Sequence, residues 1–176
     1  MELKKLKRFT TATFALWPFD PEKDSKRIHN KLVILGLNPS GKIKFGTNFA
    51  TQRGYGGRYD EWYREGFARP PFAGAYMTDL MSHVEAKSGK ALEQWKNVEF
   101  KQRCIKDLKN QFKILGVDDS TPIMCIGKTT QDLFRPEFPN FKHVFKINHP
   151  NWYRMKNKRN IFLNDLKKVR EQMSFV

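Results

Sequence analysis

The sequence has little cysteine, few acidic residues and no long apolar run. With two cysteines, four scattered histidines and no C-x-x-C pair, neither a structural zinc nor an iron–sulfur cluster is supported. Cys104 and Cys125 lie inside apolar segments, which favours buried, reduced thiols over a disulfide. No apolar stretch approaches the length of a membrane span, and no apolar signal-peptide segment follows the basic residues Met1–Arg8. We therefore expect a cytoplasmic protein without a metal, a cofactor or a membrane partner.

Positive charge is what the sequence has in excess. It contains 33 Lys and Arg against 18 Asp and Glu, a formal net charge of +15 over 176 residues. Such an excess favours a nucleic acid or another phosphate-bearing partner, although a merely soluble basic surface is the alternative. The length suits one domain spanning residues 1–176, which we expect to be a monomer.

The apolar pattern predicts an α/β fold, a three-layer α/β/α sandwich with a central four-stranded, mostly parallel sheet. Apolar residues at helical spacing predict a helix from Phe100 to Leu115, which ends at Gly116. Residues 38–74 lack sustained helical periodicity, and a loop this long in a compact domain is usually functional or disordered. The expected strands are Leu32–Leu37, Ala75–Leu80, Pro122–Gly127 and His143–Asn148. Further helices are expected at Thr129–Phe134, ending before Pro136, and at Ile161–Met173. Residues 1–30 are expected to form a basic helical extension that packs on the domain.

The segment after the first expected strand nearly matches a phosphate-binding P-loop. In parallel sheets ligands bind beyond the carboxyl ends of the strands, where Gly36-Leu37-Asn38-Pro39-Ser40-Gly41-Lys42 stands. Ile43 occupies the position of the hydroxyl that would ligate Mg²⁺, and Pro39 removes one backbone N–H donor. These two departures argue against an NTPase.

The same segment resembles the G-x-N-P-G motif of the mismatch-specific and single-strand-selective types in the uracil-DNA glycosylase superfamily. A second family motif, His-Pro, follows the last core strand, and Asn148-His149-Pro150 stands there. The run Ile126–Leu133 resembles the family's strand-to-helix turn, and the similarity covers about residues 30–170 in order and spacing. Ser40 replaces the usual Gly. Asp79 stands where related enzymes often place an Asn that reads the base, which puts specificity for uracil in doubt.

The resemblance implies a base-excision glycosylase with Asn38 and His149 as catalytic residues. Asn38 would position the attacking water, and His149 would donate a hydrogen bond to the departing base. An extruded base must stack on an aromatic ring: Phe49, eleven residues after Asn38, matches the family's spacing, and Phe45 is the fallback. Further substrate contacts are expected at Gly36, Leu37, Pro39, Ser40 and Asp79. Contacts with the DNA duplex, including a side chain that wedges into it, are expected at Asn151, Trp152, Tyr153, Arg154 and Lys156.

Each assignment has a simpler alternative. Asn38 could bond only to its own backbone in a turn, and His149 could be a loop residue without a task. Either phenylalanine could belong to the core, and Trp152 could pack on the C-terminal helix. Asp79 could cap a helix that follows through Ser82 and His83. At the level of function, the alternatives are a non-catalytic nucleic-acid-binding module and a Ser40–His149 hydrolase, although G-x-S-x-G is missing.

Overall fold

The fold is built on one five-stranded sheet in the order β1-β3-β2-β4-β5. The computed structural model describes residues 3–16, 20, 22–39, 45–46, 58–83, 88–149 and 159–174. Four strands are parallel, as expected: β2 (His29–Gly36), β3 (Ala75–Asp79), β4 (Ile123–Ile126) and β5 (Val144–Ile147). The expected α/β sandwich is confirmed, with one strand more than the four predicted.

The extra strand comes from the N-terminal segment. Strand β1 (Thr13–Phe14) pairs antiparallel with β3, and only Leu3–Leu6 are helical (α1), so the expectation of a helical extension over residues 1–30 is wrong for most of its described part. Pairing with β1 satisfies backbone groups on β3 that would otherwise form an open sheet edge. A local reading of helical spacing cannot detect this requirement.

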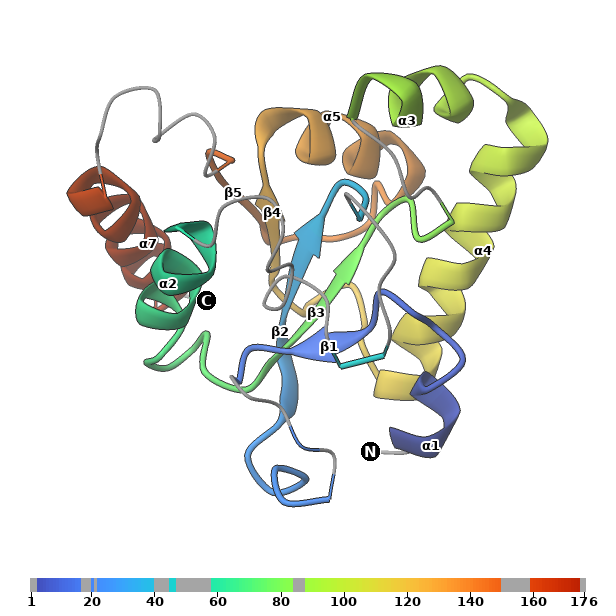
Figure 1. The fold of residues 1–176 in the computed structure, drawn as a ribbon. Coiled ribbons are helices and arrows are strands. Elements are labelled where there is room, and N and C mark those ends of the chain that lie inside the picture. Colours follow the sequence, from blue (N-terminus) through green and yellow to red (C-terminus); the bar gives the residue numbers. More distant parts are fainter. Residues whose placement is uncertain are drawn as a thin grey trace.

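Within the described residues, five longer helices cover the two faces of the sheet (Figure 1). Helices α2 (Arg58–Gly66) and α7 (Arg159–Met173) pack on one face, whereas α3 (Ser88–Trp95), α4 (Val98–Leu115) and α5 (Lys128–Glu137) lie on the other. Successive strand residues alternate between the two cores: Val33 and Leu35 face α4 and α5, and Ile34 faces α2 and α7. None of the described helices is long and apolar enough to cross a membrane.

Helix α4 agrees with its sequence signals. Asn97 accepts a hydrogen bond from the Phe100 backbone N–H at 2.9 Å, and Gly116 ends the helix with φ +68°. Cys104 on this helix and Cys125 on β4 are both buried and free, as expected. Burial raises the pKa of the Cys104 thiol to about 11 and that of the Cys125 thiol to about 12.

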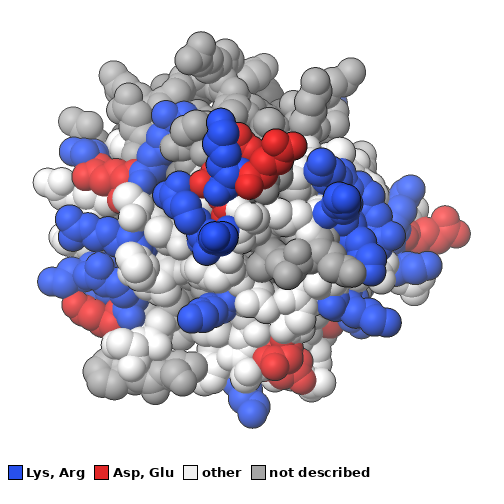
Figure 2. All heavy atoms as spheres, turned by 90° about the horizontal axis from the view of Figure 1, so that it is seen from below, with Lys and Arg blue, Asp and Glu red and all other residues white. Residues whose placement is uncertain are grey.

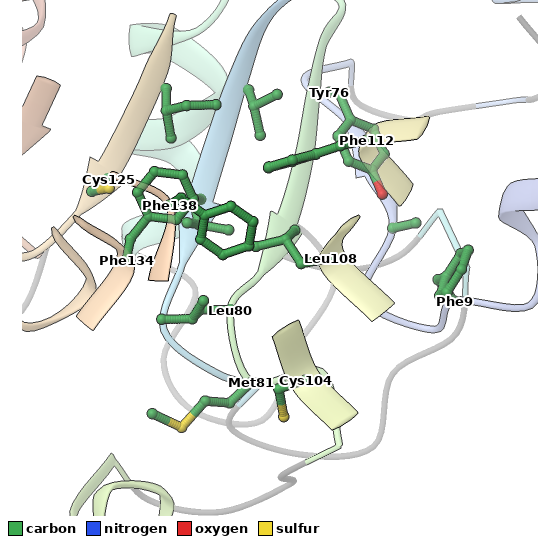
Figure 3. Packing of buried hydrophobic residues seen from close by; sticks show 14 of the residues in the cluster. Phe9, Tyr76, Leu80, Met81, Cys104, Leu108, Phe112, Cys125, Phe134 and Phe138 are labelled. Carbon is green, nitrogen blue, oxygen red and sulfur yellow. The ribbon is translucent and has the colours of Figure 1, made fainter. Parts of the chain in front are cut away.

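Two helices differ from the sequence-based expectation. Helix α5 was expected to stop before Pro136 but ends at Glu137, and the Phe138 N–H still donates to the Phe134 carbonyl at 3.0 Å. The two rings stack at 4.6 Å between centroids, within the aromatic cluster of Figure 3, which holds this last turn against the core. Helix α2 lies in the connection expected to lack helix. Its last residue, Gly66, packs closely against α7, since a Cβ on Gly66 would stand 2.4 Å from Leu166 Cδ1.

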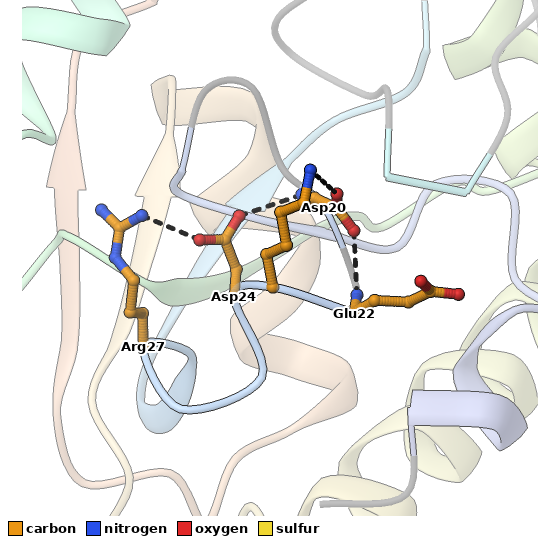
Figure 4. A network of polar contacts seen from close by, with 5 residues as sticks. Asp20, Glu22, Asp24 and Arg27 are labelled. Atoms are coloured by element: carbon orange, nitrogen blue, oxygen red, sulfur yellow. Dashed lines mark hydrogen bonds and ion pairs between the residues drawn. The ribbon is translucent and has the colours of Figure 1, made fainter.

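The chain enters β2 through a loop held by carboxylates (Figure 4). The Asp24 carboxylate accepts hydrogen bonds from the Asp20 backbone N–H at 2.9 Å and from Arg27 at 2.8 Å. Asp24 is 6% exposed, so its charge is compensated inside the loop rather than by water. This network fixes the approach to the strand that carries the candidate site at its other end.

Candidate functional site

The ends of β2 and β3 leave the sheet side by side. Gly36 is the partner of Asp79 in the parallel register, and the Leu80 N–H donates to the Gly36 carbonyl at 2.9 Å. The Met81 N–H donates to the Leu37 carbonyl at the same distance, so the pairing continues beyond the strands. Asn38 follows Leu37 directly. The sheet register therefore brings the neighbourhoods of Asn38 and Asp79 together at one edge.

The ends of β4 and β5 meet in the same way. Ile126 is the partner of Ile147, and the Gly127 N–H donates to the Ile147 carbonyl at 2.7 Å. Gly127 has φ +93°, a conformation open to glycine, and a Cβ built on it would stand 3.6 Å from His149 Cβ. His149 thus lies against the turn between β4 and α5. The sequence offered Gly127 only as part of a strand-to-helix turn and did not mark it as a neighbour of the histidine.

The central pair of strands joins these two halves. Strands β2 and β4 are neighbours in the sheet, with Leu35 opposite Cys125. The chain runs outward from β2 to β3 on one side and from β4 to β5 on the other, so the direction of winding reverses between β2 and β4. Ligands of open parallel sheets bind at such a reversal, outside the carboxyl ends. With neighbouring strands about 4.8 Å apart, the ends that carry Asn38 and His149 are separated by roughly 10 Å.

Asn38 is half-buried and makes a local contact. Its Nδ2 donates to the Pro39 carbonyl at 2.9 Å, which is the turn contact that the simpler alternative anticipates. The side-chain oxygen Oδ1 is the atom suited to accept a hydrogen bond from a water molecule. Gly36 and Pro39 are buried and Leu37 is half-buried, so Asn38 is carried on a packed support.

His149 is exposed at the surface, although the protein around it desolvates the imidazole in part. Desolvation lowers the pKa of its imidazole below the ordinary 6.5, so the ring is neutral at pH 7. A neutral imidazole still carries one N–H donor. His149 can therefore donate a hydrogen bond without bringing a positive charge into the site.

Asp79 is 3% exposed at the end of β3. The helix that it was alternatively expected to cap does not form, because residues 80–83 are turns and α3 begins at Ser88. His83 instead binds Asp107 of α4, with Nε2 and Oδ2 2.7 Å apart. The capping alternative is therefore wrong, and Asp79 stands beside Gly36 at the candidate site.

A polar network behind Asp79 was not apparent from the sequence. The Tyr76 hydroxyl and the Thr78 hydroxyl both donate to Gln111 Oε1, at 2.5 and 2.8 Å, and Thr11 Oγ1 lies 2.9 Å from Thr78 Oγ1. All four residues are buried. The network ties the last residues of β3 to α4 and to the N-terminal segment. A polar Gln111 in the apolar stripe of α4 was the one signal that could have indicated it.

The remaining predicted site residues divide into two groups. Phe45 is partly buried and packs against the core cluster, as its core alternative anticipates, while the Gly46 N–H donates to the Ala12 carbonyl at 2.9 Å. The others lie outside the described residues: Ser40, Phe49, Asn151, Trp152, Tyr153, Arg154 and Lys156. In the described part of the chain, no group of three His, Cys, Asp or Glu side chains could hold a metal ion.

Two hollows occur elsewhere on the described surface. One of about 300 Å³ lies at the start of α4, and one of about 330 Å³ lies between α2 and α7. Neither is lined by Asn38, Asp79 or His149. The strand ends, which combine polar side chains with the reversal of winding, therefore mark the candidate site better than the hollows do.

Comparison with known proteins identifies the family of the chain. The family model described as the uracil DNA glycosylase superfamily matches residues 23–172, from the loop before β2 almost to the end of α7. The searches of curated proteins and of solved structures gave no match. The matched region contains all four parallel strands and both of the strand ends that carry Asn38 and His149. The chain belongs to the uracil-DNA glycosylase superfamily, a superfamily of DNA glycosylases.

Proposed function

We propose that this protein hydrolyses the N-glycosidic bond of a deaminated or damaged base that has been flipped out of DNA. The observation that carries the proposal is the arrangement at the carboxyl edge. Asn38 follows β2 and His149 follows β5, on either side of the reversal of winding. The membership in a superfamily of DNA glycosylases supports DNA as the substrate.

In the proposed reaction, positive charge develops on the sugar and negative charge on the departing base. Asn38 acts on the side of the sugar and His149 on the side of the base. The oxygen of a water molecule bonds to C1′ of the sugar, and the N-glycosidic bond breaks with its electron pair leaving on the base. The proton that the water loses passes to solvent, and the departing base takes up a proton from solvent. Asn38 Oδ1 orients the water. His149, neutral because desolvation lowers its pKa, donates a hydrogen bond to the base oxygen on which negative charge accumulates. Neither role requires a strong base.

Asp79 narrows the substrate class. An ionised carboxylate accepts hydrogen bonds but cannot donate them, so it repels carbonyl oxygens and binds N–H groups. Asp79 is buried next to the segment that carries Asn38, where a flipped base would present its edge. We therefore propose bases with N–H groups, such as guanine-like, hypoxanthine-like or amino-bearing lesions. Phe49, with Phe45 as the fallback, is proposed as the stacking ring, and Asn151–Arg154 with Lys156 as the wedge and backbone contacts.

The experiment is a panel of duplexes that each carry one modified base, incubated with the protein and then treated with alkali to cleave at abasic sites. Asn38→Ala and His149→Ala are expected to lower turnover on the preferred duplex by about 10²-fold or more, because each removes one preorganised polar group. Their DNA affinity should change far less. Asn110→Ala and His143→Ala are matched controls, on α4 and at the start of β5, and should cleave like the parent.

A second candidate is a non-catalytic nucleic-acid-binding module on the same fold. The net charge of +15 and the presence of Asp79 favour it. Salt-sensitive binding to DNA without strand scission on any duplex of the panel would identify it. Cleavage by the parent that both alanine variants retain in full would instead show an enzyme whose catalytic residues are not Asn38 and His149.

A further inference from the structure

A cationic surface lies at the end of the molecule opposite to the candidate site. Lysines 106, 109 and 113 are exposed and follow one another at intervals of three and four residues, so they share the outer face of α4. Helix α1 lies beside the carboxyl-terminal end of α4 (Figure 1), and its neighbourhood adds exposed lysines 4 and 7. Figure 2, which views the molecule from this end, shows blue side chains gathered at the right. We call these five lysines the α1–α4 surface: Lys4, Lys7, Lys106, Lys109 and Lys113.

The charge of this surface is not neutralised by neighbouring carboxylates. Among the described residues no ion pair is formed by any of the five lysines, and the stretch from Leu3 to Leu16 contains no acidic residue. The acid on the same half of α4, Asp107, is already bound to His83. The surface ends at the turn after α4, where Asp118 and Asp119 are exposed. A surface with this charge attracts a polyanion.

The α1–α4 surface and the candidate site lie at opposite ends of the molecule, and a short straight duplex that lies on one of them does not bend around to the other. Asn30, at the start of β2, donates to the Leu115 carbonyl at the end of α4, over 2.6 Å. Asn38 comes eight residues later along a strand that rises about 3.3 Å per residue, so roughly 26 Å separates the two ends. DNA has a persistence length of about 150 base pairs, and a duplex of about 15 base pairs is therefore a stiff rod.

We propose that the α1–α4 surface is a second DNA-binding surface, which holds the phosphate backbone of a duplex segment separate from the one at the carboxyl edge. Lysine side chains bind phosphates as point charges and do not read the sequence. The three lysines of α4 extend over about 10 Å at 1.5 Å per residue, which is enough to contact several phosphates of one groove wall. One chain can then hold two duplexes at once.

The test uses the full chain and two lesion-free duplexes of about 15 base pairs, one immobilised and one labelled. The wild type, loaded on the immobilised duplex, is expected to capture the labelled one. In the triple variant K106Q/K109Q/K113Q, the affinity for the labelled duplex should fall by at least 10-fold. Each phosphate that a lysine neutralises releases about 0.9 condensed counterions, and this favourable contribution is lost at three positions. The matched control K23Q/K167Q/K168Q removes the same charge from exposed lysines elsewhere and should capture like the wild type. Circular dichroism checks that both variants are folded.

Sedimentation of the complex in solution completes the test. One chain with two duplexes supports the proposal. One duplex per chain at saturation, or two chains bridging two duplexes, overturns it. Equal capture by the triple variant and its control overturns it too. None of these measurements requires base excision, so a protein that cleaves no duplex of the panel would contradict the proposed function and leave this result standing.

Discussion

Gly127 connects the stability of the sheet to the position of His149. Its backbone has φ +93° and ψ 148°, close to a region that is occupied almost only by glycine. Its N–H also bonds β4 to the Ile147 carbonyl, two residues before the histidine. In Gly127→Ala the new Cβ would stand 3.6 Å from His149 Cβ, which is an ordinary contact. The cost therefore comes from backbone strain, about 1–3 kcal/mol.

Thermal unfolding measures this cost. A change of 1 kcal/mol shifts the Tm of a chain of this length by about 2–4 °C, so Gly127→Ala should unfold roughly 2–12 °C below the wild type. Gly89→Ala is the matched control, because a Cβ there meets nothing within 4 Å and the residue lies in α3. It should be more stable by about 0.4–1 kcal/mol, because alanine restricts the unfolded chain.

The same variant tests the link to the candidate site. If the strain is relieved by moving the turn, His149 moves with it, and base excision should fall more than the loss of folded protein at the assay temperature explains. A Tm for Gly127→Ala equal to that of the wild type would refute the reasoning, since the turn would then accept a side chain without strain.

Three further predictions concern Gln111, His149 and Asp79. Gln111→Leu removes the acceptor of the Tyr76 and Thr78 hydroxyls and should lower the free energy of unfolding by about 1–3 kcal/mol in denaturant titrations; no change would show that water replaces it. Because desolvation lowers the pKa of His149 in the folded state, the stability it contributes is complete above pH 6.5 and is lost as pH falls through the folded pKa. Between pH 7 and pH 5.5, the free energy of unfolding should thus fall less in His149→Gln than in the wild type. An equal fall in both proteins would contradict this prediction. Asp79→Asn should shift preference in the lesion panel towards uracil, and an unchanged ranking would remove Asp79 from the site.

The sequence alone determined the elements that depend on local or strongly periodic signals. The four parallel strands were visible as short apolar runs. The facing residues of β2, β3 and β4 are buried on both sides of the sheet, which leaves little room for polar residues, whereas the edge strand β5 has one exposed residue, Lys146. Helix α4 could be predicted to its last residue because five buried apolar side chains share one face and Gly116 ends it. The order of strands and helices then placed Asn38 and His149 at one edge, since parallel strands have their carboxyl ends together.

The tertiary structure decided the features whose energy lies in distant contacts. Strand β1 has only two residues and exists through its pairing with β3, more than sixty positions away. Helix α2 and the last turn of α5 depend on α7 and on the phenylalanine cluster, which overcome weak or unfavourable local propensity. The contact between Gly127 and His149, the burial of Asp79 and the lowered pKa of the histidine arise only when β2, β3, β4 and β5 are assembled, because desolvation is a property of the packed neighbourhood rather than of the residue.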